Sequence, residues 1–356
     1  MDHPGARGVL GRTMTRVPTD AAQLDFLTRV QKILDEGQFV ATYKFALLVA
    51  LIDVAIERGD DSGDALDVPL DWIAGKFIEL YWGHTREFQG AVLRQNTGSN
   101  IAVLGRIGRL QAHAMSLADA RRTRQWRAAV GDVARIVKAM PLMRLQLLRG
   151  GLRDPFLYDE EVFDGAIRLK PGVVYCLRKF STLLGSLARH GWLREVRDNP
   201  KNAYAVGATQ SLETFLFGDE RVPLGKVREV LIPLQGGRCF YCGGRLNDDA
   251  HVDHFIPWAL YPSNLGHNFV LADRACNTDK SDLLADFSHL DRWKGRNEGG
   301  GRDLADAFAS RGIVTDLAAS QGIARWAYQR AGATLAVVWV ARNETRVMAR
   351  ADAREV

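Results

Sequence analysis

The chain has 356 residues, of which 47% are hydrophobic and 25% are charged, and its formal net charge is +5. This composition is typical of a globular protein and excludes a fibrous repeat and a wholly disordered chain. The longest apolar run, residues 45–52, is far shorter than the roughly 18 residues that a membrane-spanning helix needs. We therefore expect no membrane-spanning segment and no membrane as a partner.

The N-terminal residues 1–20 are interrupted by Gly, Arg, Pro and Thr, and they contain no apolar stretch long enough for the core of a signal peptide. We therefore expect a disordered arm on a cytoplasmic protein. Disulfide bonds are rare in that compartment, which affects how the cysteines are interpreted.

The next part of the chain carries mainly helical patterns. Apolar residues recur at every third or fourth position over residues 43–54, which predicts a helix with one apolar stripe. A second helix, opened by a proline, is expected over residues 69–81, and helical periods continue through residues 101–149. A short strand at residues 167–169 and a further helix over residues 173–192 complete this region. The sequence thus predicts a mainly α protein.

Positive charge is concentrated in residues 86–153, which contain thirteen Arg or Lys residues against three acidic ones, Glu87, Asp119 and Asp132. Their balance is +10, although the whole chain carries only +5. Arginines on outer helix faces are often simply solvated. A concentrated basic region is nevertheless a candidate surface for a polyanion such as nucleic acid.

Cysteines and histidines gather in the last third of the chain. Cys239, Cys242 and Cys276 lie within 38 residues of one another, whereas Cys176 stands alone in an apolar helical pattern. Clustered cysteines without an export signal indicate metal binding rather than a disulfide framework. We interpret Cys176 as a packed small hydrophobic residue.

The segment from 251 to 284 carries the residue types needed for phosphodiester hydrolysis. A strand at 252–256, a strand at 268–271 and a helix at 275–284 would bring Asp253 and His254 to one cleft with the polar face of that helix. A neutral histidine is a suitable base for activating water near pH 7. A carboxylate and an amide oxygen can hold a divalent cation against the phosphate.

These residues resemble the HNH (ββα-metal) nuclease motif. The carriers of the resemblance are His-Val-Asp-His-Phe-Ile-Pro at 251–257, His-Asn-Phe-Val-Leu at 267–271 and Asp-Arg-Ala-Cys-Asn-Thr-Asp-Lys-Ser-Asp at 273–282. The order of the elements is similar to that of the HNH domain of RNA-guided CRISPR effector nucleases, in a variant with asparagine in place of the final histidine. The resemblance covers about 60 residues.

The resemblance implies a role for each of these residues. His254 would be the general base, while Asp253 and Asn277 would bind the catalytic Mg²⁺ or Mn²⁺. Asn268 would brace the loop that orients His254, and Lys280 would contact phosphate. His251 alternates with Asp253 along the strand, so it either approaches the metal or is a partly exposed strand residue. His267 and His289 are interpreted as structural or surface residues.

The cysteines depart from the family pattern. Many HNH domains hold a structural zinc ion with two Cys-x-x-Cys pairs, but the second pair in this chain begins with Asp273 and ends with Cys276. Two interpretations remain open for Asp273. It is either the fourth ligand of a Zn²⁺ site together with Cys239, Cys242 and Cys276, or the N-cap of the following helix.

The predicted organisation comprises a partly basic helical domain at 21–225, the nuclease module at 226–293 and a helical C-terminal segment at 294–356, entered through a Gly-rich break at 298–301. We expect a metal-dependent DNA endonuclease, with restriction or phage defence as the setting that the resemblance implies. One active site cuts one strand, so double-strand breaks would need a homodimer or two sequential nicks. The alternatives are a nucleic-acid-binding protein with an inactive HNH fold and a nuclease that acts on RNA or modified DNA.

Overall fold

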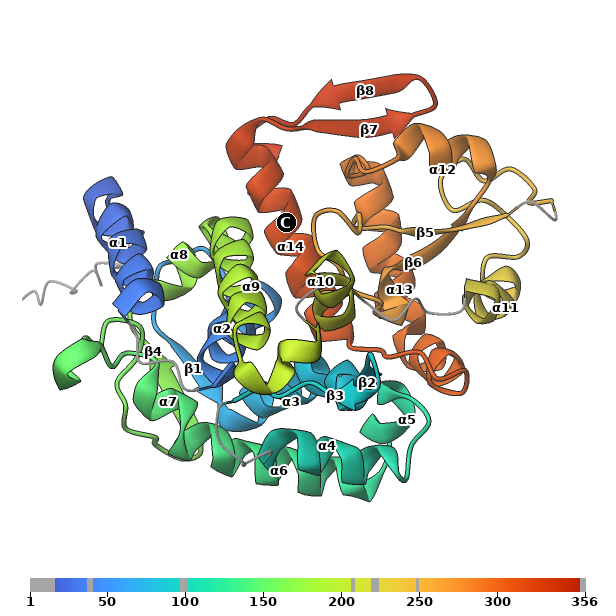
Figure 1. Ribbon diagram of the computed structural model, residues 1–356. Helices are drawn as coiled ribbons and strands as arrows, with labels where there is room; N and C mark the ends of the chain where they lie inside the picture. The colour runs from blue at the N-terminus through green and yellow to red at the C-terminus, as the bar shows by residue number, and fades with distance from the viewer. Residues whose placement is uncertain are drawn as a thin grey trace, which may run out of the picture.

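The computed structural model of the protein describes residues 17–36, 41–96, 102–205, 209–218, 224–247 and 250–352. The described chain is mainly α-helical, and its sheets are small antiparallel pairs of strands (Figure 1). This confirms the predicted fold class. None of the described helices is long and apolar enough to cross a lipid bilayer. Most of the arm predicted at residues 1–20 lies outside the described residues.

Most of the first two thirds of the chain forms a layered bundle of helices with two strand pairs. Its helices are α1 (Asp20–Glu36), α2 (Tyr43–Arg58), α3 (Leu70–Tyr81), α4 (Ala102–Gln111), α5 (Leu117–Arg121), α6 (Arg124–Ala139), α7 (Pro141–Arg144), α8 (Val173–Lys179), α9 (Ser181–Arg197) and α10 (Thr209–Phe217). Its strands are β1 (Leu66–Pro69), β2 (Glu87–Phe88), β3 (Ala91–Val92) and β4 (Ala166–Leu169), paired as β1 with β4 and β2 with β3.

The rest of the chain contains the strands and the helix of the proposed nuclease motif. Its helices are α11 (Leu224–Leu234), α12 (Arg274–Lys280), α13 (Phe287–Ala309) and α14 (Leu317–Thr334). Its strands are β5 (His251–His254), β6 (Phe269–Ala272), β7 (Val337–Ala341) and β8 (Glu344–Val347), paired as β5 with β6 and β7 with β8.

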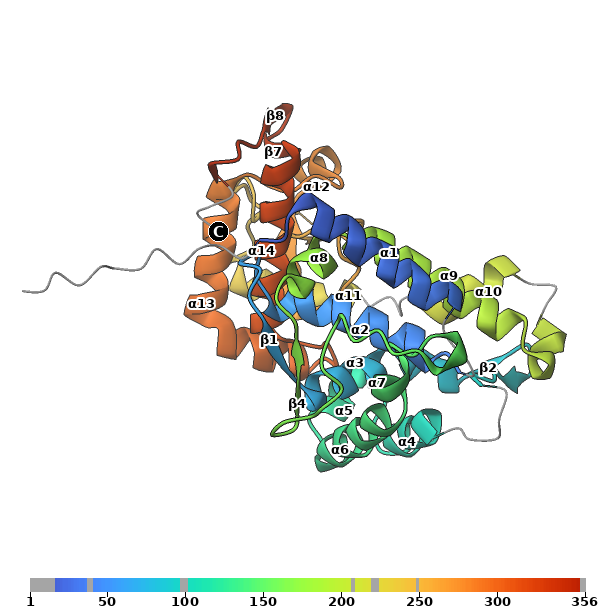
Figure 2. The same ribbon diagram turned by 90° about the vertical axis from the view of Figure 1, so that its left-hand side faces the viewer.

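Helix α2 is the centre of the molecule and packs against α3, α8, α9 and α14 (Figures 1 and 2). The sequence predicted a single apolar stripe, but nearly every residue of α2 is buried because neighbouring helices cover it on several sides. Helix α14 approaches so closely that a Cβ atom at Gly322 would lie 2.0 Å from the Glu57 carbonyl oxygen. Only glycine permits this contact, and it joins the two ends of the chain in one core.

Two expectations about the C-terminal part were wrong. The glycines at 298–301 do not break the chain but lie inside the continuous helix α13, so the predicted boundary at residues 293 and 294 also falls inside this helix. Each helical glycine costs about 1 kcal/mol relative to alanine. Burial of Trp293, Leu304 and Phe308 on either side of the glycines opposes that cost. The chain then ends in the β7–β8 hairpin rather than in helix alone.

Candidate functional site

Strands β5 and β6 and helix α12 form the predicted ββα arrangement. The strands pair antiparallel with Asp253 opposite Val270 and His254 opposite Phe269, and α12 packs against β5. Helix α12 ends at Lys280, four residues earlier than predicted, because Ser281 adopts a left-handed backbone conformation with φ of 48°. The arrangement places the end of β5 beside the last turn of α12.

His254 is the last residue of β5, and its half-buried ring lies 5.2 Å from the ring of Trp258 and 4.8 Å from that of Phe269, between centroids. Its Nε2 atom is 3.3 Å from Asn264 Oδ1. An amide oxygen can only accept a hydrogen bond, so Nε2 carries the proton and Nδ1 keeps its lone pair. Burial lowers the pKa of His254 below the ordinary histidine value. The ring is therefore neutral at pH 7 and is suited to accept a proton.

Asn268 fixes the chain that follows His254. Its Oδ1 accepts a hydrogen bond from the Ile256 amide at 2.8 Å, and its Nδ2 donates to the Ile256 carbonyl at 3.0 Å. Its own carbonyl accepts the Phe255 amide at 2.8 Å. Because both polar atoms of this buried side chain are engaged, Asn268 positions the turn rather than taking part in proton transfer.

Asp253 is held by two buried donors. Its Oδ2 atom accepts hydrogen bonds from the Tyr241 hydroxyl at 2.5 Å and from Lys280 Nζ at 3.0 Å. The Lys280 side chain is 0% exposed, and its ammonium also donates to the His254 carbonyl at 3.2 Å. The expected role of Lys280 as a phosphate contact is therefore corrected: the ammonium is buried and serves as the counterion of Asp253.

Two oxygen ligands remain for a catalytic cation. The second carboxylate oxygen of Asp253 accepts no hydrogen bond from the described residues, and neither does the Asn277 amide oxygen. Asn277 lies one turn before Lys280 on α12, so it is on the helix face that meets β5. Mg²⁺ binds oxygen and keeps several waters, so this small set of hard ligands fits Mg²⁺ or Mn²⁺. The Lys280 charge, however, offsets that of Asp253.

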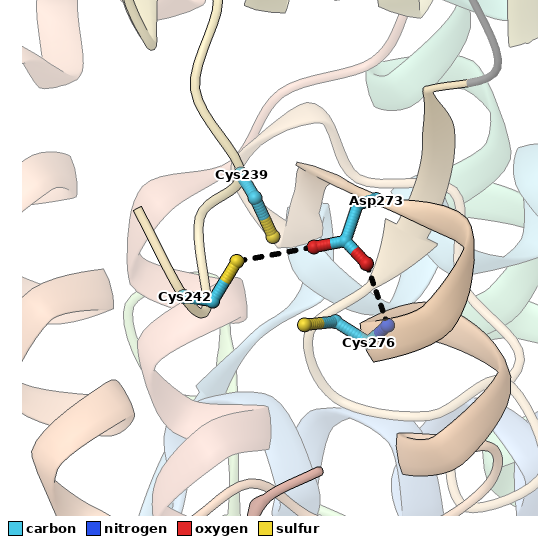
Figure 3. A group of neighbouring side chains, drawn as sticks. All are labelled: Cys239, Cys242, Asp273 and Cys276. Atoms are coloured by element: carbon cyan, nitrogen blue, oxygen red, sulfur yellow. Dashed lines mark hydrogen bonds between the residues drawn. The ribbon is translucent and has the colours of Figure 1, made fainter. Parts of the chain in front are cut away.

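The cysteine cluster lies at the other end of α12. The ligand atoms of Cys239, Cys242, Asp273 and Cys276 all lie within 4.8 Å of one another and can hold a metal ion (Figure 3). Sulfur atoms bound tetrahedrally to zinc at about 2.3 Å are roughly 3.8 Å apart, so a small contraction would complete the site. Burial raises the pKa of Cys239 to about 11, and a bound zinc ion would displace that thiol proton.

The two interpretations of Asp273 are both partly right. Its Oδ1 accepts the Cys276 amide at 2.9 Å, which makes Asp273 the N-cap of α12, and its Oδ2 accepts the Cys242 thiol at 3.1 Å (Figure 3). Burial acts to raise the pKa of Asp273, but these hydrogen bonds lower it below its ordinary value overall. One oxygen thus caps the helix while the other faces the thiols.

This dual role predicts the behaviour of Asp273→Cys. The variant is expected to bind zinc more tightly, because thiolate is the preferred ligand of structural zinc, and to be more stable with zinc than without it. Without metal it should lose about 0.5–2 kcal/mol of stability, because the cap is removed. Urea unfolding and zinc content, with and without added zinc, test this. Asp273→Asn is the matched control, because it keeps the cap and removes the charge. Equal stability of the metal-free Cys variant and wild type would contradict the capping role.

The cysteine cluster and Asp253 are connected through Tyr241. This tyrosine lies between Cys239 and Cys242 in the chain, and its hydroxyl donates to Asp253. Arg292 of α13 fixes the same loop by donating to the carbonyls of Phe240 and Tyr241 at 2.6 and 3.0 Å. The role of Tyr241 was not predicted from the sequence, although its place inside a Cys-x-x-Cys pair was a usable signal.

The C-terminal hairpin supports α12 from outside. Asp279 on α12 accepts hydrogen bonds from Trp339 Nε1 at 2.7 Å and from the Asn343 amide at 2.8 Å. Strand β7 also forms a parallel bridge from Trp339 to Ala285, beyond α12. The hairpin is therefore part of the structure that holds the site, and no sequence pattern near the motif indicated it.

The remaining predicted residues have structural positions. His267 and His289 are buried, and their Nε2 atoms lie 3.4 Å from the Gly301 carbonyl and 2.9 Å from the Val340 carbonyl. Cys176 is buried in the main core, as predicted. His251 begins β5 opposite Ala272 and is half-buried, and nothing in its surroundings decides between its two interpretations.

Similarity to known proteins is found in the first two thirds of the chain. The family described as a domain of unknown function (DUF8808) matches residues 23–214, which is more than half of the chain. The matched region runs from α1 into α10 and ends before the cysteine cluster and the ββα arrangement. No curated protein and no solved structure matches the chain.

Proposed function

The chain belongs to the family described as a domain of unknown function (DUF8808), and we propose that it is a metal-dependent HNH endonuclease that hydrolyses phosphodiester bonds in DNA. The observation that carries the proposal is the convergence of a neutral His254, at the end of β5, with Asp253 and the Asn277 turn of α12. The resemblance to nucleases of this type suggests a setting in restriction or phage defence.

The protein side of the proposed reaction is activation of a water molecule by His254. The hydrogen bond from Nε2 to Asn264 holds the ring, and the free Nδ1 accepts the proton of the attacking water. Trp258 and Phe269 flank the ring, so it has little freedom to rotate. The clamp from Asn268 to Ile256 keeps the chain after His254 in place. Positioning of this kind is a major source of rate enhancement.

A divalent cation bound by Asp253 and Asn277 would polarise the phosphate and stabilise the leaving oxygen. The buried Lys280 neutralises Asp253, so the protein alone offers this cation little net negative charge. The scissile phosphate would supply the missing charge. We therefore expect the cation and DNA to bind more tightly together than separately. A Zn²⁺ ion in the cysteine cluster would have a structural role, fixing the loop that carries Tyr241.

Cleavage of supercoiled plasmid tests the proposal. Purified protein should convert it first to the nicked form when Mg²⁺ or Mn²⁺ is added, because one active site cuts one strand. The negative control omits both cations instead of adding EDTA, since EDTA would also remove zinc from the cysteine cluster. Single-stranded RNA and modified DNA should be assayed in parallel. Binding without cleavage of any substrate would favour an inactive HNH fold, and selective cleavage of RNA would favour a ribonuclease.

The pH dependence of cleavage follows from the state of His254. Only the neutral ring can accept a proton, so the rate should fall as the pH drops through a pKa that lies below the ordinary histidine value. Asn264→Asp would place a carboxylate beside Nε2 and favour the charged ring, so the acidic limb should move to higher pH. Asn264→Leu should move it to lower pH. Profiles of kcat/KM and an NMR titration of His254 measure both shifts, and an unmoved limb in both variants would contradict the assigned base.

A further inference from the structure

Helix α6 carries a basic stripe, which we define as Arg124, Arg127, Arg135 and Lys138. At about 100° per residue, these four positions fall within roughly 80° of the helix circumference. The stripe is about 21 Å long, because 14 residues separate its ends at a rise of about 1.5 Å each. Gly131 lies in the same sector, and a Cβ atom there would meet nothing within 4 Å. The middle of the stripe is therefore open to a partner.

The charges of the basic stripe are largely uncompensated. All four side chains are exposed, and among the described residues only Arg135 has an ion pair, with Asp132. Asp132 is shared with Arg106 of the adjacent helix α4. Residues 102–151 contain ten Arg or Lys residues and only two Asp residues. The surface around α6 therefore has a strong positive potential.

The arrangement is unfavourable for the isolated protein. The N-terminal end of a helix carries a partial positive charge, so cations in the first turn are destabilising there. Arg124 and Arg127 occupy the beginning of α6, and its first turn contains no acidic residue. Like charges three or four residues apart add a further unfavourable interaction. A bound polyanion would relieve both effects.

We propose that the basic stripe on α6 binds the phosphate backbone of a nucleic acid, outside the ββα site. Double-stranded DNA carries one charge per about 1.7 Å, so a 21 Å stripe faces roughly 12 phosphates. A lipid surface fits less well, because the apolar face of α6 is packed against α3 and α4 and cannot insert into a bilayer. This inference rests on the proposed function for its choice of polyanion.

The position of α6 agrees with an extended substrate. Arg122, just before α6, donates from Nη1 to the Ala309 carbonyl at the end of α13, so the helix begins beside the part of the chain that carries the ββα site. From there α6 runs away along the lower edge of the molecule (Figure 1). The whole stripe lies within residues 23–214, so the family domain would have the task of binding the substrate.

Binding of a labelled DNA duplex of about 30 base pairs, without Mg²⁺ or Mn²⁺, tests the stripe. Arg124→Ser, Arg127→Ser and Lys138→Ser combined should weaken binding. The slope of log affinity against log salt concentration should become shallower by up to about 2.7, which is about 0.9 for each of the three phosphates released from a cation. The control combines Lys32→Ser, Arg168→Ser and Arg194→Ser, three exposed cations outside the stripe. It should keep the wild-type slope. An unchanged slope in the stripe variant would overturn the proposal.

Two further measurements separate the other outcomes. Arg124→Glu should raise the melting temperature, since it places an acid in the first turn of α6, and should still weaken DNA binding. A variant that gains stability and keeps full affinity would count against the stripe. If the stripe variant loses binding to phosphatidylserine vesicles but not to DNA, the partner is a membrane and the proposal fails. Because binding is measured without cleavage, a wild type that binds through the stripe but never cuts would reject only the nuclease proposal.

Discussion

Replacing His254 with alanine is expected to lower the rate of DNA cleavage by about 10²–10⁴-fold, the usual contribution of a general base. The affinity for DNA and the melting temperature should change little. The imidazole is only half-buried, its hydrogen bond to Asn264 is long at 3.3 Å, and no charge is left unpaired when the ring is removed. Cleavage of plasmid by wild type and variant at the same Mg²⁺ concentration measures the effect.

The control for this experiment is His190→Ala. His190 lies exposed on α9, so the change removes an imidazole outside the ββα site and should leave cleavage unaffected. Added imidazole serves as a rescue test, since a small base could occupy the space vacated by the ring. Cleavage by His254→Ala at more than about a tenth of the wild-type rate would show that another group is the base.

The sequence identified the elements whose patterns are local. The apolar repeat around α2 and the strand–strand–helix order from β5 to α12 were predicted because strand and helix periods depend only on neighbouring residues. The cysteine cluster was predicted from spacing for the same reason. The structure thus confirms those parts of the candidate site that a short stretch of sequence encodes.

The remaining features depend on contacts between distant parts of the chain. The glycines at 298–301 suggested a break, but α13 continues through them because its buried residues on both sides pack into the cores. The burial of Lys280 depends on Tyr241 and β5, which lie far from it in sequence. The capping and thiol contacts of Asp273 are compatible only because its two oxygens point in different directions (Figure 3).

A zinc ion in the cysteine cluster would act on Asp253 through Tyr241. This tyrosine is buried between the aromatic rings of Phe240 and Trp339, at centroid distances of 5.3 and 5.1 Å, so its hydroxyl has little freedom once the cysteine loop is fixed. If zinc leaves the cluster, the metal no longer holds this loop and the donor to Asp253 is less constrained. A structural metal would thereby influence the orientation of the proposed catalytic carboxylate without touching it.

The largest effect on stability is expected for Lys280→Met. Removing one partner of a buried ion pair usually costs about 3–5 kcal/mol, because the other charge is left without compensation. Lys280 is 0% exposed and Asp253 only 13%, so the remaining carboxylate would be poorly solvated. Urea unfolding should show a markedly lower midpoint with little change in slope. Lys226→Met, on the exposed face of α11, is the control and should be nearly neutral.

A double variant isolates the ion pair from other losses. Asp253→Asn alone should also destabilise the protein, because it leaves the Lys280 ammonium buried beside a neutral amide. Asp253→Asn with Lys280→Met removes both charges, so its loss of stability should be smaller than the sum of the two single losses by more than about 1 kcal/mol. If Lys280 were instead a phosphate contact, Lys280→Met would retain its stability and lose only DNA cleavage. Strict additivity, or a stable Lys280→Met protein, would therefore reject the counterion role assigned to Lys280.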